Sequence, residues 1–244
     1  MPKKLGEALK SVVGEGYGEG EEKKGRAESV LMNRNRQQIF QFLIFHPCSS
    51  ARKVANELKI SPPTVKWHLD KLVAGGYVSQ SVVSNKKVFY PTMMVSEGDM
   101  VNILEAVNRD RIGLTFLSII ENEGTTQRDI AKILGTSIQS VRSYVSTLER
   151  LGLITTIVDG RNRRYFPSDK LKRLDKTMRK RIRNFRRFLL KKLEEDRLKP
   201  SIDLSTRREA EITIKVSKRK ESIKIPAEPF TSSVISLAGG EHFS

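Results

Sequence analysis

The chain has 244 residues, of which 38% are hydrophobic and 30% charged, so it can hold one large domain or two small ones. The single cysteine, Cys48, excludes a disulfide framework and a cysteine metal cluster. No run of about 18 apolar residues predicts a membrane span, and the N-terminus lacks an apolar signal core, so we expect a soluble cytoplasmic protein. The net charge of +17 favours a polyanionic partner, because basic side chains beside phosphates release bound counterions.

The positive charge is concentrated in two segments. Residues 31–95 carry nine basic and two acidic side chains, and residues 169–199 carry fourteen basic and five acidic ones. Residues 1–30, rich in Gly, Glu and Lys, are balanced in charge and cannot bury a core, which predicts a disordered arm. We therefore expect the polyanion to meet the first folded unit and one late segment.

Residues 31–95 begin with three predicted helices. Apolar side chains at helical spacing predict the first, which starts at Asn33. Ser50 and Ser61 are suited to begin the next two, because a serine hydroxyl accepts hydrogen bonds from the free N–H groups of a first turn. In the third helix His68 is expected to pack inward rather than to contact a ligand. The inward face of this helix is Val65, His68, Leu69 and Leu72.

A β-hairpin follows these helices. Gly75-Gly76 ends the third helix, and Tyr77–Val83 and Lys87–Tyr90 predict two strands joined by a turn. This order of three helices and a hairpin is that of a winged helix-turn-helix domain. In that plan the third helix docks on DNA and the hairpin forms the wing.

The sequence repeats itself after a shift of 76 residues, with no gap from the first helix to the end of the hairpin. Helix caps, core positions, glycines and strand ends all agree. The matched pairs include Phe40 with Phe116, Ser61 with Ser137, Leu72 with Leu148, Gly76 with Gly152, and Pro91 with Pro167. We therefore predict a second winged helix-turn-helix domain over residues 109–168, joined to the first by an acidic linker over 96–108. The predicted fold class is α+β, mainly α with small β-hairpin wings.

A long basic amphipathic helix is predicted over residues 169–199. Its apolar residues recur every three or four positions from Leu171 to Leu193, and Lys and Arg crowd the opposite face. The apolar stripe is expected to pack on the chain's own domains or to form a homodimer through residues 170–198. The basic face could also follow DNA, whereas binding to an anionic membrane is the least favoured alternative. Residues 200–244 predict short strands or a disordered tail, with Glu211–Val216 alternating like a strand.

Outward residues of the two third helices and of the two wings are the candidate DNA contacts. Such side chains on a docked helix face the major groove, and basic wing tips suit the phosphate backbone or a narrow minor groove. The competing interpretation is an ordinary solvated surface, and Trp67 alternatively packs on a neighbouring helix. The candidates are Pro63, Thr64, Lys66, Trp67, Lys71, Asn85, Lys86 and Lys87 in the first unit and Gln139, Arg142, Ser143, Arg161, Arg163 and Arg164 in the second.

The third helix of the first unit resembles the recognition-helix signature of ArsR-type winged helix regulators. The matching residues are Ser61, Thr64, Val65, Lys66, His68, Leu69, Leu72, Gly76, Tyr77 and Val78. In the second unit Tyr144 stands where the signature has His, so only the general fold carries over. ArsR-type metal sensors use Cys or His clusters, which this sequence lacks, so metal sensing does not transfer.

Tandem, basic, cysteine-poor winged helices of this size also resemble archaeal transcription regulators, including the euryarchaeal archaellum regulators. That resemblance implies a nucleoid-associated activator that recruits general transcription factor B or RNA polymerase to weak promoters. It implies no cofactor.

The sequence therefore predicts a sequence-specific, double-stranded-DNA-binding transcription regulator that is not an enzyme. It contains no phosphate-binding glycine loop, HExxH or GxSxG motif, and its three His leave little for acid–base chemistry. Two alternatives remain open. One is a protein-interaction scaffold that uses winged helices within transcription machinery, and the other is a non-specific chromatin or RNA binder.

Overall fold

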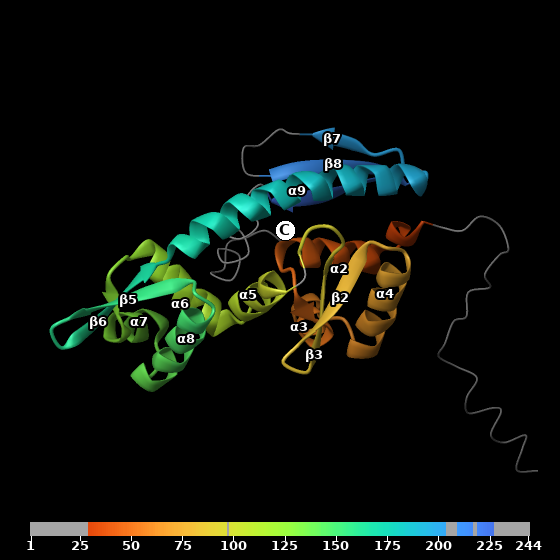
Figure 1. The fold of residues 1–244 in the computed structure, drawn as a ribbon. Coiled ribbons are helices and arrows are strands. Elements are labelled where there is room, and N and C mark those ends of the chain that lie inside the picture. The colour runs from red at the N-terminus through yellow and green to blue at the C-terminus, as the bar shows by residue number, and fades with distance from the viewer. Residues whose placement is uncertain (1–28, 97, 204–208, 217–218, 227–244) are drawn as a thin grey trace, which may run out of the picture.

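The computed structural model describes residues 29–96, 98–203, 209–216 and 219–226. The predicted N-terminal arm lies outside the described residues except for Ser29, which is buried, and Val30, which begins the 3₁₀ helix η1 (Val30–Met32). Helices dominate, and the strands form small antiparallel sheets (Figure 1), so the predicted α+β class is confirmed.

The first unit contains three helices and a small sheet. Side chains cap each helix: the Asn33, Ser50 and Ser61 side chains accept hydrogen bonds from the first turns of α2, α3 and α4. The sheet has the order β1-β3-β2, and β1 was not predicted because two residues are too short to show a pattern. The elements are α2 (Arg34–Phe45), β1 (Ser49–Ser50), α3 (Ala51–Leu58), α4 (Pro62–Ala74), β2 (Val78–Val83) and β3 (Lys86–Pro91).

The second unit repeats the first, and each of its elements begins and ends 76 residues later in the chain. Its sheet has the matching order β4-β6-β5, and the pairing of Ser50 with Val88 recurs as that of Thr126 with Arg164. The predicted duplication is therefore confirmed at the level of the backbone. The elements are α6 (Asp110–Glu121), β4 (Thr125–Thr126), α7 (Gln127–Leu134), α8 (Ile138–Arg150), β5 (Ile154–Asp159) and β6 (Asn162–Pro167).

The segment expected to be a linker consists mainly of a packed helix, α5 (Asp99–Val107). Met100, Ile103, Leu104 and Val107 are buried in the common core. Their spacing of three, one and three residues is that of a helix with one apolar face. The acidic character of the segment concealed this pattern, and the two units are joined by a packed helix rather than by an extended connection.

A long helix and a three-stranded sheet follow the second unit. Helix α9 (Asp169–Glu195) has 27 residues and spans about 40 Å. It is followed by β7 (Ser201–Asp203), β8 (Glu209–Val216) and β9 (Arg219–Pro226), in the order β7-β8-β9. The expected strand over Glu211–Val216 is confirmed, and it pairs with β9. Residues 227–244 lie outside the described part of the chain.

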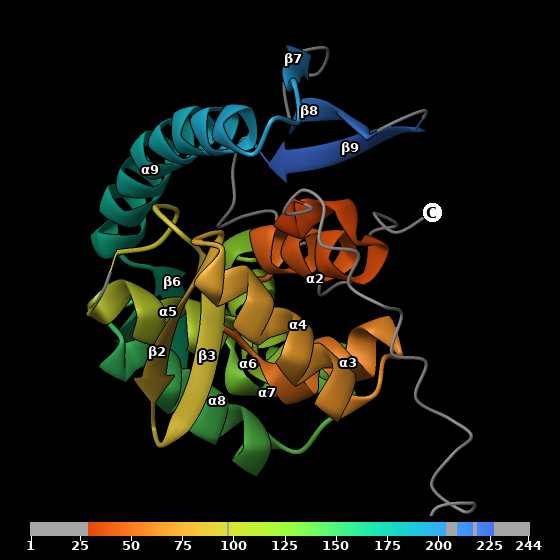
Figure 2. The same ribbon diagram turned by 90° about the vertical axis from the view of Figure 1, so that its right-hand side faces the viewer.

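These C-terminal elements return to the first unit. Figures 1 and 2 show α9 and the β8–β9 hairpin lying over α2. The Phe185 ring of α9 lies 6.4 Å from the Phe40 ring of α2, and the Gln41 side chain accepts a hydrogen bond from the Lys224 amide and donates one to its carbonyl oxygen. Helix α2 is therefore covered by the end of the chain.

The apolar stripe of α9 is buried within the chain from Met178 to Leu193, and Leu171 and Leu174 at its start are half-buried. Of the alternatives that the sequence left open, the structure favours packing on the protein's own domains. The homodimer through residues 170–198 stays a prediction. The fully covered residues are Met178, Ile182, Phe185, Leu189 and Leu193.

Candidate nucleic-acid interface

Helix α4 is held with one face inward and the other in solvent. Ser61 caps it, Pro62 occupies its first position, and Val65 and Leu69 are completely buried. His68 is also buried, as predicted, and its Nε2 lies 3.3 Å from the Asn35 Nδ2 of α2. Burial and the nearby Arg36 lower the pKa of His68, so the ring is neutral at neutral pH and serves packing.

The solvent face of α4 carries Pro63, Lys66, Trp67 and Lys71. Trp67 is 53% exposed, and its ring meets His68 edge-on while the Lys71 ammonium lies 5.6 Å from its centroid. The indole is therefore held in place on the helix yet open to a partner. Thr64 is only half exposed, and its hydroxyl lies 2.6 Å from the Ser61 hydroxyl, so it takes part in the helix cap.

The first wing presents three exposed polar or basic side chains at its tip. Asn85 has a φ of 62° in the turn between β2 and β3, and asparagine tolerates this left-handed conformation better than most residues. Lys86 and Lys87 follow at the start of β3, and both are exposed. The structure thus places the three predicted wing residues together, at the end of the hairpin farthest from the α2 core (Figure 1).

Helix α8 repeats the arrangement of α4 with different side chains. Ser137 caps it, and Val141 and Val145 face the core. Gln139, Arg142 and Ser143 are exposed on the other face. Tyr144, the counterpart of His68, is half-buried and packs against the core, so the departure from the ArsR-type signature lies on the packing side of the helix.

The second wing is tied down at one of its arginines. Arg164 Nε donates to the Asp159 carboxylate at 2.6 Å, and its guanidinium also donates to the Gly124 carbonyl oxygen at 3.1 Å. Arg161 and Arg163 are exposed. Two of the three predicted wing arginines therefore remain open to a phosphate, whereas Arg164 fixes the wing to the loop before β4.

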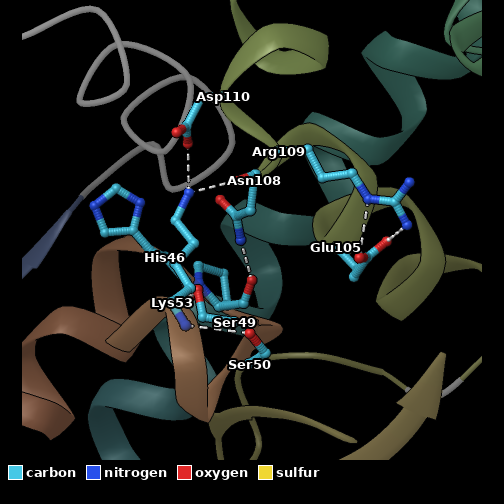
Figure 3. A network of polar contacts seen from close by, with 9 residues as sticks. His46, Ser49, Ser50, Lys53, Glu105, Asn108, Arg109 and Asp110 are labelled. Carbon is cyan, nitrogen blue, oxygen red and sulfur yellow. Dashed lines mark hydrogen bonds and ion pairs between the residues drawn. The ribbon is translucent and has the colours of Figure 1, made fainter. Parts of the chain in front are cut away.

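A polar network at the junction of the two units was missed from the sequence (Figure 3). The Lys53 ammonium of α3 donates to the Asp110 carboxylate at 2.7 Å and to the Asn108 carbonyl oxygen. The buried Asn108 side chain donates in turn to the Pro47 carbonyl oxygen. These bonds join the start of α6 to the first unit, so the two units are held together by more than the chain connection. The apolar spacing of α5 was the one sequence signal for this junction.

Among the described residues, no helix is long and apolar enough to cross a membrane. Within the same ranges no three His, Cys, Asp or Glu side chains are grouped so that they could hold a metal ion.

The duplicated unit is similar to a known protein family. Residues 32–79 and 117–155 each match the model of a winged helix-turn-helix DNA-binding family. Both units have the fold of a winged helix-turn-helix domain. We call them the first and second winged domains, and the two matches end 76 residues apart, in keeping with the repeat.

One curated relative is similar to part of the chain. The chain is 23% identical, over 149 residues, to an uncharacterized HTH-type transcriptional regulator from Methanocaldococcus jannaschii. The match covers 61% of this chain but only 37% of the relative, so the chain spans little more than a third of that protein's length.

Solved structures give weaker matches. A MarR family transcriptional regulator from Rhodococcus sp. RHA1 has a TM-score of 0.26 and 23% identity, over 36% of this chain and 71% of that one. ZitR from Lactococcus lactis has a TM-score of 0.24 and 18% identity, over 61% of this chain and 95% of that one. Both TM-scores are too low to support an argument about this chain.

Proposed function

We propose that the chain is a sequence-specific, DNA-binding transcription regulator whose two winged domains contact one duplex. The observation that carries the proposal is the repeated pairing of a capped, half-buried third helix with an exposed basic wing. In each domain the inward face is fixed by the core, and the outward face offers cations and hydrogen-bonding groups to solvent. The archaeal relative described as a transcriptional regulator supports the same function.

In each domain the third helix is expected to read base edges and the wing to contact phosphates. Lys66 and Lys71 on α4, and Gln139 and Arg142 on α8, enter the major groove, where Arg, Lys and Gln pair with the purines. The wing tips, with Lys86, Lys87, Arg161 and Arg163, contact the phosphate backbone or the minor groove. Trp67 lies against sugar or thymine methyl groups.

One chain then offers two DNA-binding domains, as a dimer of single-domain regulators does. The domains, which we propose to extend over residues 31–95 and 109–168, sit on one polypeptide, and the Lys53–Asp110 contact helps to fix their spacing. Two linked contacts raise the effective concentration of the second, so the pair should bind more tightly than either half. The first domain, with its excess of basic residues, makes the larger contribution.

The resemblance to archaeal activators extends the proposal to the regulated step. We propose that the bound chain recruits general transcription factor B or RNA polymerase to weak promoters. Transcription in vitro on a template carrying the bound site tests this step. Transcript levels should rise with the protein at limiting factor B, and a fall would mark a repressor instead.

The salt dependence of DNA binding tests the proposed docking face. Replacing Lys66 and Lys71 by Gln should weaken binding and reduce the slope of log affinity against log salt by about 2, roughly 1 for each lost phosphate or base contact. The matched control replaces Lys172 and Lys191, two exposed lysines that pair with acidic residues on α9. An unchanged slope in the α4 variant, or equal changes in both, would contradict the assignment.

Two other functions would give different results in the same assay. A protein-interaction scaffold would show no duplex binding at physiological salt. A non-specific chromatin or RNA binder would bind every duplex alike, whereas a regulator selects a preferred site from random duplexes.

A further inference from the structure

The outward side of α9 carries a line of basic side chains that the fold does not use. We call it the basic face, and it consists of Arg173, Lys176, Lys180, Arg183 and Arg187. Consecutive members are three or four residues apart, and all five are exposed. At that spacing the side chains lie along one side of a helix, here over about 21 Å. The opposite side of α9 is the buried apolar stripe, so the basic face points away from the body of the protein.

The charges of the basic face are not compensated within the described residues. Several other cations of α9 have acidic partners: Arg179 bonds to Asp175 at 2.8 Å, and Lys192 lies 3.6 Å from Asp196. None of the five residues of the basic face has an acidic partner in the described part of the chain. Like charges three and four residues apart destabilise a helix, so this row opposes folding rather than assists it.

Helix α2 separates the basic face from α4. On one side Phe40 of α2 packs near Phe185 of α9, and on the other Asn35 of α2 lies 3.3 Å from His68 of α4. Figures 1 and 2 both show α9 along the upper side of the molecule and α4 and α8 on the lower side. A duplex seated on the outward face of α4 is therefore separated from the basic face by α2.

We propose that the basic face of α9 binds the phosphate backbone of a second segment of double-stranded DNA, so that one chain joins two duplexes. The inference rests on the proposed function, in which the winged domains hold the first duplex. Uncompensated cations in a row are complementary to a row of phosphates, and such contacts are independent of sequence. Protein interfaces need an apolar centre, and none of the exposed large hydrophobic side chains of the described residues lies on α9.

A capture experiment with the full chain tests the proposal. A duplex carrying the preferred site is immobilised, and retention of a second, fluorescent duplex without that site is measured as salt is varied. Replacing Lys176, Lys180 and Arg183 by Gln should weaken capture of the second duplex by about tenfold or more and reduce its log–log salt slope by about 3. Affinity for the immobilised site should change by less than about twofold, because the docking helices are untouched.

A matched control removes the same charge from the same helix. Lys172, Arg179 and Lys191, which pair with acidic residues, are replaced by Gln, and capture should stay within about twofold of the unaltered chain. A charge-conserving variant, Lys176→Arg with Lys180→Arg, should retain capture. Circular dichroism establishes that each variant keeps its helix content.

The outcomes separate this inference from the proposed function. If the chain binds the immobilised site but captures no second duplex, the inference is overturned and the proposed function stands. If it binds no duplex at all, both are overturned. Equal losses in the basic-face and control variants, or capture that survives in the basic-face variant, would overturn the inference in favour of net charge or of a second copy of the chain. Retention of polyglutamate in place of DNA would overturn it in favour of an acidic protein.

Discussion

The two winged domains share one backbone but differ at positions where that backbone is left-handed. Gly124 and Gly135 have φ angles of 81° and 58° in the second domain, and their counterparts in the first are Cys48 and Lys59, at 67° and 54°. A residue with a side chain costs roughly 1–2 kcal/mol more than glycine there. The first domain therefore carries local strain that the second avoids.

The domains also differ in what covers them. The first is packed under α9 and the β8–β9 hairpin, and Asp196 at the end of α9 accepts hydrogen bonds from the Tyr77 hydroxyl at 2.6 Å and from Ser29. The second contacts the start of α9, where Lys170 donates to the Leu151 carbonyl oxygen. We infer that packing under α9 and the β8–β9 hairpin, rather than the conformational preference of the local backbone, stabilises the first domain.

A substitution in the buried stripe of α9 should show how much this cover stabilises the first domain. Replacing Phe185 by Ala removes a fully buried ring from between α9 and α2 and should cost about 3–5 kcal/mol of unfolding free energy. Trp67, the chain's one tryptophan, lies in the first domain, so denaturant titration followed by its fluorescence reports that domain. The half-buried Phe188 of the same helix provides the control, and its replacement by Ala should cost clearly less. Equal costs would mean that the stripe is not the contact that matters.

A pH-dependent difference comes next. His46 ends α2, is buried against the Phe42 ring, and has Asn122 as its counterpart in the second domain. Burial, and secondarily the Lys53 charge, lower its pKa from 6.5 to about 4. The unfolded chain therefore takes up the proton first, and stability is lost as the pH falls from about 6.5 to 4. Between pH 7.5 and 5 the loss from this group should be about 2 kcal/mol.

Copying the second domain into the first isolates that contribution. His46→Asn should remove most of the extra acid sensitivity, as measured by urea unfolding at the two pH values. His68, whose pKa is also lowered, is present in both proteins and cancels in the difference. If the variant and the unaltered chain lose equal stability on acidification, burial of His46 is not the cause.

Exchanging the residues at one pair of left-handed positions should change stability less. Lys59→Gly should raise the melting temperature of the first domain slightly, because relief of the left-handed conformation offsets the extra freedom of glycine when unfolded, for a gain of about 0.5 kcal/mol. Gly135→Lys in the second domain should instead cost about 1 kcal/mol. Shifts of the same sign in both variants would show that the two turns are not equivalent.

Local signals made much of the fold predictable. The caps at Ser50 and Ser61, the glycines after the third helices, and the 76-residue repeat each follow from short-range chemistry. The role of α5, the docking of Gln41 on β9 and the junction at Lys53 depend on long-range packing, which periodicity within one segment does not encode. Of the candidate contacts, those on exposed helix faces could be placed in advance. The bond that Arg164 donates to the Gly124 carbonyl oxygen could not, because that partner lies 40 residues away in the chain, whereas the contact of Thr64 with Ser61 is local.

A hydroxyl-radical footprint of the full chain on its preferred duplex tests whether both winged domains contact one duplex. Two winged domains on one duplex predict two protected segments about one helical turn, or roughly 10 base pairs, apart. Replacing Gln139 and Arg142 by Ala should remove the protected segment that the second domain covers. Replacing Lys66 and Lys71 by Ala should weaken protection of the segment that the first domain covers before protection of the other. A single protected segment that is lost in the first-domain variant and unchanged in the second-domain variant would contradict the account.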